Sequence, residues 1–250
     1  MIKLKTSQEL KIMEHAGKIL SETMWELIKA VGPGVSELEL DALAEKLIIE
    51  KGGEPGFKKV EGYKHTICIS TNDVCVHGIP SAYRFKAGDK VGIDCGAYYN
   101  GFHSDMSETT VVEPVSDEVK KFIATGKKAL EESIKQAVVG NRVFDISGII
   151  QHIVEVEGGY SVVRSLVGHG VGKELHEEPE VPGYIFGRRG KSPELKEGMV
   201  IAIEVIYNMG DPDLTLDNDG WTLRTRDGSL SGLFERTIAI TNKGPKLLTP

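Results

Sequence analysis

Five residues of this sequence, four of them carboxylates, have the types and the setting of metal ligands: Asp94, Asp105, His169, Glu204 and Glu235. Most of them lie in apolar stretches typical of strands, or beside glycines. A charge in such a stretch is unfavourable unless it is paired or binds a metal. Two divalent cations would balance four carboxylates, and one imidazole completes an oxygen-rich ligand set. The pattern predicts a dinuclear metal site, which in proteins is usually hydrolytic.

Simpler interpretations of the same residues remain open. The two aspartates could be solvated strand residues, and Glu204 could pair with a buried arginine. Glu235 has Arg236 beside it as an ordinary ion-pair partner. Glycines on both sides of His169 permit a close backbone approach and an exposed imidazole. Each histidine taken singly reads as structural or solvated, so the hypothesis depends on the whole set.

A hairpin is expected to bring the two aspartates together. Asn100–Gly101 is a strong signal for a two-residue hairpin turn. Such a turn places Asp105 opposite Gly96 and Asp94 opposite Ser107. Both aspartates then share one face of the hairpin as diagonal neighbours, about 7–8 Å apart at the backbone.

The elements that must hold these residues are two helix pairs, each followed by strands. Capping-box spacing at Thr6–Glu9 and at Ser36–Glu39 predicts two helix starts, and glycines follow both helices. The expected helices span 7–31, 37–51, 116–138 and 144–157, and the expected strands span 91–99, 102–112, 199–207 and 232–241. Helices on one side of a mainly antiparallel sheet define an α+β fold. We expect one domain, 1–250, with pseudo-twofold halves of approximately 1–112 and 113–250. Chance similarity of two amphipathic helix pairs is the alternative.

Composition narrows the class of protein. The chain has 250 residues, 40% hydrophobic and 27% charged, and a formal net charge of -7. An acidic chain without a Lys/Arg block argues against nucleic acid as the main ligand. Three cysteines without CxxC spacing fit a reducing cytoplasm. The sequence has no signal-peptide pattern and no apolar run long enough to cross a membrane.

Around the five residues the chain resembles the methionine aminopeptidases of the pita-bread metallopeptidase family. The resemblance covers essentially the whole chain, all five metal positions and the family's spacing between Asp94 and Asp105. The short stretch between His169 and Glu204 leaves no room for the insertion of the type II enzymes, so the type I group is implied. The matching stretches are 68–72, 76–80, 92–95, 101–105, 168–172, 175–179 and 231–237.

The resemblance implies roles for the metal ligands. Asp94 would chelate one metal, Asp105 and Glu235 would bridge both, and His169 and Glu204 would complete the other. The two divalent ions would be Co, Mn, Fe or Zn. A water between two cations has a lowered pKa and can attack the first peptide bond.

The resemblance also implies catalytic and substrate-binding residues. His176 would polarise the scissile carbonyl, His77 would position the peptide, and Glu204 would transfer a proton to the leaving amine. Both histidines would therefore contact the substrate. The methionine side chain would be bound by Tyr63, Cys68 and Trp221.

The implied activity is removal of the initiator methionine from new chains whose second residue is small. The expected enzyme is a cytoplasmic monomer that contacts the ribosome transiently and binds no membrane. Three departures from the family pattern bear on the pocket or on strand geometry: Val60 replaces a tyrosine, Leu175 replaces a phenylalanine, and Val205 replaces a proline. The alternatives are an Xaa-Pro aminopeptidase or dipeptidase of the same fold and, from another class, a non-catalytic binding protein.

Overall fold

The computed structural model describes residues 1–250, and its helices form two pairs. None of the helices has the length and apolar character needed to cross a bilayer. The helices are α1 (Ser7–Ala30), α2 (Glu37–Glu50), α3 (Asp117–Ile134) and α4 (Val143–Gln151), with a π-helix (His152–Glu157) continuing α4 and short 3₁₀ helices at Phe57–Lys59 and Arg189–Lys191.

Both predicted capping boxes are present. The Thr6 hydroxyl accepts a hydrogen bond from the Glu9 backbone N–H, and the Glu9 carboxylate accepts one from the Thr6 N–H at 2.8 Å. Ser36 and Glu39 repeat this exchange at the start of α2. Each box satisfies N–H groups that the first helical turn leaves without partners.

The second helix pair differs from the expected ranges at its ends. The helix expected to reach Val138 ends at Ile134, and hydrogen-bonded turns follow it. The helix expected over 144–157 is α-helical only to Gln151 and then widens into the π-helix. The periodicity of apolar residues does not distinguish these helix types over so short a segment.

The strands form one ten-stranded sheet and one small three-stranded sheet, and every pairing is antiparallel. The main sheet runs β1-β4-β5-β12-β9-β7-β8, with β2 beside β4, β6 beside β9 and β13 beside β12; the small sheet is β10-β11-β3. The strands are β1 (Glu54–Pro55), β2 (Ile67–Thr71), β3 (Val74–Val76), β4 (Lys90–Tyr99), β5 (Phe102–Val111), β6 (Ser161–Val162), β7 (Gly168–Gly170), β8 (Glu177–Val181), β9 (Val200–Asn208), β10 (Leu214–Leu216), β11 (Leu223–Thr225), β12 (Ser231–Thr241) and β13 (Gly244–Leu247).

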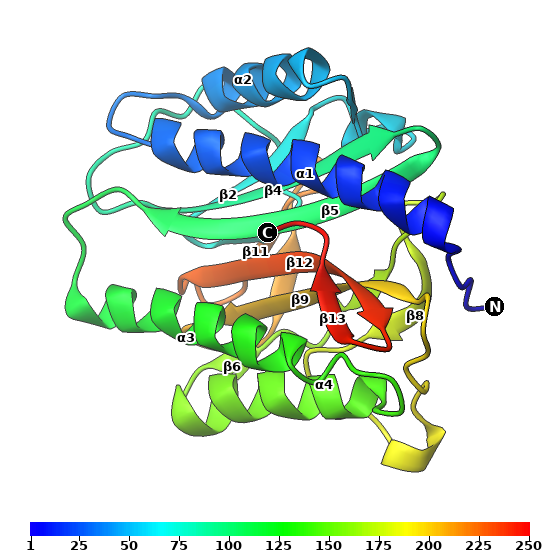
Figure 1. The fold of residues 1–250 in the computed structure, drawn as a ribbon. Helices are drawn as coiled ribbons and strands as arrows, with labels where there is room; N and C mark the ends of the chain where they lie inside the picture. Colours follow the sequence, from blue (N-terminus) through cyan, green and yellow to red (C-terminus); the bar gives the residue numbers. More distant parts are fainter.

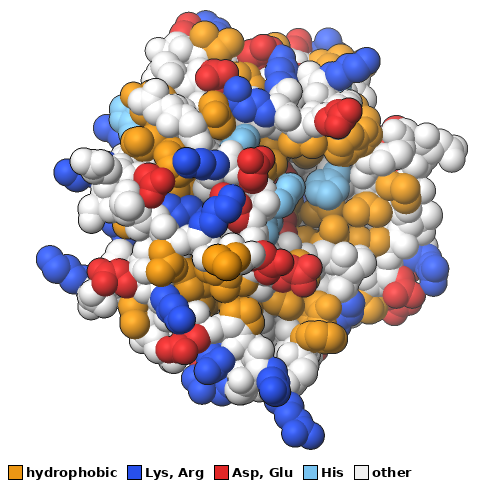
Figure 2. Space-filling view, turned by 90° about the vertical axis from the view of Figure 1, so that its right-hand side faces the viewer, with side chains coloured by type: hydrophobic (Ala, Val, Ile, Leu, Met, Phe, Trp, Pro, Cys, Tyr) orange, Lys and Arg blue, Asp and Glu red, His pale blue; other side chains and the backbone are white.

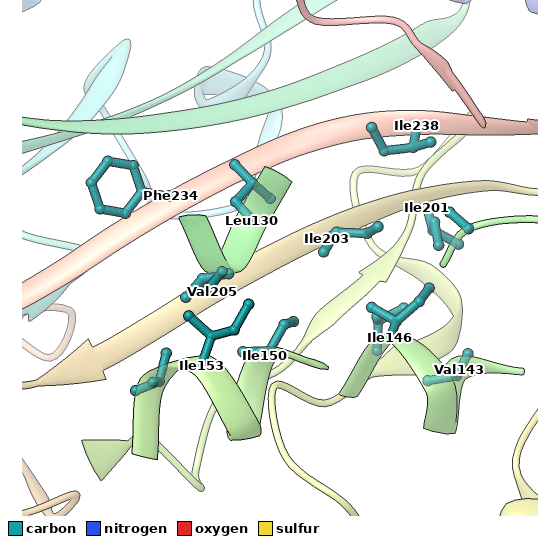
Figure 3. Packing of buried hydrophobic residues seen from close by; sticks show 14 of the residues in the cluster. Leu130, Val143, Ile146, Ile150, Ile153, Ile201, Ile203, Val205, Phe234 and Ile238 are labelled. Carbon is teal, nitrogen blue, oxygen red and sulfur yellow. The ribbon is translucent and has the colours of Figure 1, made fainter. Parts of the chain in front are cut away.

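Both helix pairs cover the same face of the main sheet, as predicted. Helices α1 and α2 lie over β4 and β5, and α3 and α4 lie on the side of β9 and β12 (Figure 1). The core under each pair uses alternate strand residues, such as Ile93 of β4 and Ile203 of β9. Figure 3 shows side chains of α4, including Ile146 and Ile150, packed toward those of β9. Residues of opposite parity, which include Asp94 and Glu204, therefore face away from the helices.

The two hairpin-like strand pairs meet where β5 lies beside β12. Only Glu235↔Ser107 and Arg236↔Met106 pair directly there. Thr237 extends the contact: its hydroxyl accepts from the Asp105 N–H at 3.0 Å and donates to the Asp105 carbonyl at 2.7 Å. Thr109 makes the same pair of bonds to Leu233 on the other side. The halves are thus joined through a short ladder with a threonine at each end.

Candidate metal centre and substrate cavity

A row of polar side chains crosses the four central strands on the face without helices. Asp94 pairs with Ser107, Ser107 with Glu235, and Glu235 with Glu204. Directly opposed residues of antiparallel strands point to the same face, so these side chains lie side by side. The structure thus brings three of the predicted ligands into one row across β4, β12 and β9.

Asp105 and His169 join this row from neighbouring positions. Asp105 lies opposite Gly96, and Asp94 lies opposite Ser107, as the hairpin turn predicts. His169 lies opposite Ala202, two residues from Glu204 on the same face of β9. The His169 Nε2 atom lies 3.8 Å from Asp105 Oδ2 and 3.9 Å from Glu235 Oε1. One ligand atom from each of Asp105, His169 and Glu235 lies within 4.8 Å of the other two.

Glycines allow His169 to reach this position. A Cβ atom at Gly168 would lie 2.4 Å from the Ala202 carbonyl oxygen, and one at Gly170 would lie 2.3 Å from that of Glu178. The expectation of an exposed imidazole is wrong, because only 12% of the His169 side chain is exposed. Its Nδ1 lies 2.9 Å from the Gly170 carbonyl oxygen. A proton on Nδ1 would leave Nε2 free as a ligand directed at the carboxylates.

Burial and mutual repulsion disfavour ionisation of the carboxylates when no cation is present. Burial is the main cause in every case. It raises the pKa of Asp105 to about 7 and, together with the Asp105 charge, raises the pKa of Glu204 to about 8. The pKa values of Asp94 and Glu235 lie well above their usual range for the same reasons. Burial lowers the pKa of His169 to about 4, so its imidazole is neutral at pH 7.

The protein supplies no cation of its own to this cluster. None of the four carboxylates forms an ion pair with lysine or arginine, and the buried Asp94 Oδ1 and Glu235 Oε1 atoms have no hydrogen-bond partner. Arg236 instead pairs with Glu108 at 2.6 Å, so the ion pair considered for Glu235 does not form. No buried arginine accompanies Glu204 either. Partnerless buried oxygens next to a neutral imidazole fit a divalent metal.

His77 and His176 line the same cavity as the carboxylates. The rings of His176 and His169 lie 4.3 Å apart in an edge-to-face arrangement. His77 has the left-handed backbone conformation, with a φ of 56°. Burial, then the charge of His176, lowers the pKa of His77. Both imidazoles are therefore placed to exchange hydrogen bonds with a molecule in the cavity.

The cavity has a volume of about 540 Å³, and its apolar end contains the predicted pocket residues. Tyr63, Cys68 and Leu175 pack with Phe57 in one buried cluster, to which Val60, Ile79 and Trp221 add partly buried surface. Cys68 lies opposite Asp94 in the β2–β4 ladder, which places this pocket directly beside the carboxylates. Figure 2 shows a hollow on this side of the molecule where histidine and acidic side chains lie among hydrophobic ones.

A hydrogen-bonded turn positions Trp221. The Asp219 carboxylate accepts bonds from the N–H groups of Trp221 and Thr222, each at 2.8 Å, and from the Thr222 hydroxyl at 2.6 Å. The Trp221 ring meets that of Tyr63 edge to face, with 5.1 Å between centroids. This contact closes one side of the apolar pocket.

The three residues that depart from the family pattern, Val60, Leu175 and Val205, lie in different places. Val60 and Leu175 both line the cavity, so both affect its shape. Val205 does not line it: its side chain is fully buried in the core under α3 and α4. Strand β9 pairs in unbroken register through Val205, which lies opposite Phe234. Valine at that position therefore leaves the strand that carries Glu204 regular.

Several cavity residues carry no signal in the sequence. Phe57, Leu166 and Ile206 look like ordinary core residues until the fold assembles them. Glu178 and Glu180 line the opening, but charged residues in a loop or edge strand are usually solvated. The position of Thr237 beside the predicted ligands can be expected from the sequence. It lies two residues from Glu235 in a strand and therefore on the same face.

Comparisons with known proteins agree with this geometry. Residues 11–242 match the model of metallopeptidase family M24. The chain is 47% identical to the methionine aminopeptidase of Clostridium perfringens over 249 residues, which cover 100% of this chain and 99% of the relative. The crystal structure of the methionine aminopeptidase from Thermotoga maritima superimposes with a TM-score of 0.96 at 38% identity, covering 100% of this chain and 99% of that one.

The wider fold family includes proline-specific enzymes. The prolidase from Pyrococcus furiosus has a TM-score of 0.79 and 28% identity, covering 99% of this chain but 65% of the prolidase. The predicted α+β pita-bread fold is thereby confirmed. From its ligand row, its fold and these matches, the chain belongs to metallopeptidase family M24.

Proposed function

We propose that this chain is a metal-dependent aminopeptidase that removes the initiator methionine from new proteins whose second residue is small. The observation that carries the proposal is the row of four carboxylates and one imidazole on the floor of a partly apolar cavity, with no protein cation beside it. Full-length relatives named methionine aminopeptidase support the same activity. Membership of the family implies use of a divalent metal.

Two divalent ions, drawn from Co, Mn, Fe and Zn, would fit the donor set. Asp94 would hold one ion, Asp105 and Glu235 would bridge both, and His169 and Glu204 would hold the other. When bound, the ions would supply Lewis-acid chemistry, polarising a carbonyl and lowering the pKa of a water. The partnerless oxygens of Asp94 and Glu235 support this assignment.

The remaining polar groups would bind the peptide and move protons. His176 would donate a hydrogen bond to the oxygen of the first peptide carbonyl as negative charge develops there. His77 would hold the peptide near the nitrogen that becomes the leaving amine. Glu204 would take a proton from the attacking water and pass it to the leaving amine. These three groups would be the catalytic residues of the chain.

The apolar end of the cavity would select methionine. Tyr63, Cys68 and Trp221 surround a space next to the carboxylates, and a thioether makes favourable contacts with the edges of aromatic rings. The preference for a small second residue would follow if the backbone beside the ligands leaves little room for that side chain. The substitutions at Val60 and Leu175 would tune the pocket without removing a ligand.

The cellular setting forms part of the proposal. The enzyme would act in the cytoplasm as a monomer, on peptides and nascent chains, with transient contact to the ribosome. Three free, buried cysteines suit a reducing compartment. Residues 1–250 would form one catalytic domain with halves of approximately 1–112 and 113–250, each with its own hydrophobic core.

Release of free amino acids from two peptides tests the proposal. Protein stripped of metal would be incubated with Met-Ala-Ser or Ala-Pro-Ala after Mn, Co, Fe or Zn is added back. Methionine release that requires metal is the expected result. Cleavage of Ala-Pro-Ala alone would assign the chain to the proline-specific branch, and binding of metal without either cleavage would favour a non-catalytic protein.

A further inference from the structure

A lysine lies buried on the active-site face of the sheet without a carboxylate partner. Lys90 is the first residue of β4, and only 1% of its surface is exposed. It shares the face of Asp94, four residues further along the strand. It forms no ion pair. A fully buried lysine without a counter-charge is unusual and calls for a specific role.

The ammonium group holds both sides of the turn between β2 and β3. Its Nζ donates to the Ser70 carbonyl at 2.8 Å and to the Val74 carbonyl at 3.1 Å. The backbone of Lys90 binds the tip of the same turn. Its N–H donates to Asn72 Oδ1 at 3.0 Å, and its carbonyl accepts from the Asn72 N–H at 2.9 Å. The turn is thus wrapped around this one residue.

The segment that leaves this turn carries His77. Before His77 it is held by Lys90, through the Val74 carbonyl, and by the pairing of Val74 and Val76 with β11. After His77 it is held at Gly78, whose carbonyl accepts from the Ile69 N–H at 2.9 Å. A Cβ atom at Gly78 would lie 2.0 Å from the Ile69 carbonyl oxygen, so only glycine permits this close approach to β2. His77 lies between the two fixed points in the left-handed conformation, which is unfavourable for a non-glycine residue. The surroundings must hold it there.

The environment of the amine is consistent with a buried donor. Burial lowers the pKa of Lys90 to about 7, and the nearby Cys75 and Asp73 raise it by smaller amounts. Both protonation states of the amine carry N–H groups that can donate to the two carbonyls. The two hydrogen bonds from the amine to the turn therefore depend on the position of the nitrogen atom and not on its charge.

We propose that Lys90 is a positioning residue of the active site, whose buried amine holds the β2–β3 turn and through it the His77 imidazole at the substrate. The inference rests on the proposed function of His77. Lys90 itself does not line the cavity, so it acts on the substrate only through this turn.

A double-mutant cycle tests the coupling. Lys90→Met keeps an unbranched side chain one atom shorter and removes its donors. The kcat for Met-Ala-Ser should fall about 10- to 100-fold because a catalytic group is misplaced. Bound metal and KM should change little. In a His77→Ala background the same substitution should lower kcat less than about twofold, since the group that it positions is absent. Equal losses in both backgrounds, or wild-type kcat in Lys90→Met, would overturn the proposal.

Chemical rescue gives a second and independent test. Lys90→Ala leaves the two carbonyls without their donor, and methylammonium can refill the space whereas tetramethylammonium has no N–H to offer. Recovery of kcat with methylammonium alone supports the proposal, and no recovery with either contradicts it. Failure of both variants to fold with metal present would assign Lys90 to folding and overturn it as well.

A crystal structure of Lys90→Met separates this inference from the proposed function. A displaced β2–β3 turn and a rotated His77 support the positioning role even if the wild-type protein releases no methionine. An unmoved His77 contradicts it even if the wild-type protein is fully active.

Discussion

At the scale of single residues, the candidate metal centre reduces the stability of the metal-free protein. Glu235 is buried among three other carboxylates and has a partnerless oxygen. Glu235→Gln should raise the free energy of unfolding in EDTA by about 0.5–2 kcal/mol. The Glu235 carboxyl must be protonated when the metal-free protein folds, whereas glutamine needs no proton. The substitution should also lower kcat more than ~100-fold.

Urea unfolding in EDTA and methionine release with metal measure the two effects of Glu235→Gln. Glu50→Gln, an exposed carboxylate far from the site, is the matched control and should change neither. Loss of stability in metal-free Glu235→Gln would mean that the cluster is already neutralised by the protein.

The raised pKa values of the carboxylates also predict how the stability of the metal-free protein depends on pH. Folding raises the pKa of Asp105 from 3.8 to about 7 and that of Glu204 from 4.5 to about 8. Below about pH 6.5 this effect is opposed by four histidines whose pKa values are lowered by burial, namely His77, His103, His169 and His176. Between about pH 7 and pH 8 the carboxylates dominate, the folded state binds more protons than the unfolded state, and its stability falls as the pH rises. The urea midpoint in EDTA should decline across this window, less steeply in Glu204→Gln. A midpoint in EDTA that rises from about pH 7 to pH 8 would contradict the assignment.

At the scale of elements, the junction of β5 and β12 decides how the ligands of the two halves meet. Thr237→Val keeps the shape of the side chain but leaves the Asp105 N–H and carbonyl without partners. Stability should fall by about 1–3 kcal/mol, and metal should bind more weakly because Asp105 is less firmly held.

Thr237→Ser keeps the hydroxyl and is the control for this junction. Denaturant unfolding and metal titration by calorimetry measure both quantities. Equal metal affinity in Thr237→Val and the wild type would show that the backbone of β5 is held by other contacts.

Local sequence signals determine much at this scale. The Asn100–Gly101 turn fixes the register of the whole hairpin, so the face shared by Asp94 and Asp105 could be predicted. The end of α3 at Ile134 and the π-helix after Gln151 could not, because small differences in hydrogen bonding decide them. The mostly buried state of His169 depends on β8 and β9 packing around β7, which glycine spacing does not reveal.

At the scale of the whole molecule, the ligands come from both halves of the sheet. Asp94 and Asp105 lie on one strand pair, and His169, Glu204 and Glu235 lie on strands of the other. Metal should therefore stabilise the entire fold, by about 2.7 kcal/mol at a concentration of 100 times Kd. The melting temperature with Mn should exceed that in EDTA, and Glu235→Gln should show a smaller increase. Equal melting temperatures would contradict metal binding across the halves.

The candidate metal ligands could be proposed from the sequence, but most residues of the cavity walls could not. The five ligands stand out because charges are rare in apolar strands, so the metal residues could be proposed before the fold was known. Phe57, Leu166 and Ile206 have no such contrast with their neighbours, and only the assembled fold places them around one space. Only the family resemblance points to Tyr63, Cys68 and Trp221 as pocket residues, because each taken singly is typical of an ordinary buried position.

One titration tests the central claim most directly. Metal-stripped protein would receive Mn in steps, and bound Mn and methionine release from Met-Ala-Ser would be measured on the same samples. The account predicts no release without metal, a rate that rises together with bound Mn, and in Glu235→Gln weaker Mn binding and a rate lowered more than ~100-fold. A metal-free sample that releases methionine as fast as the loaded one would contradict it.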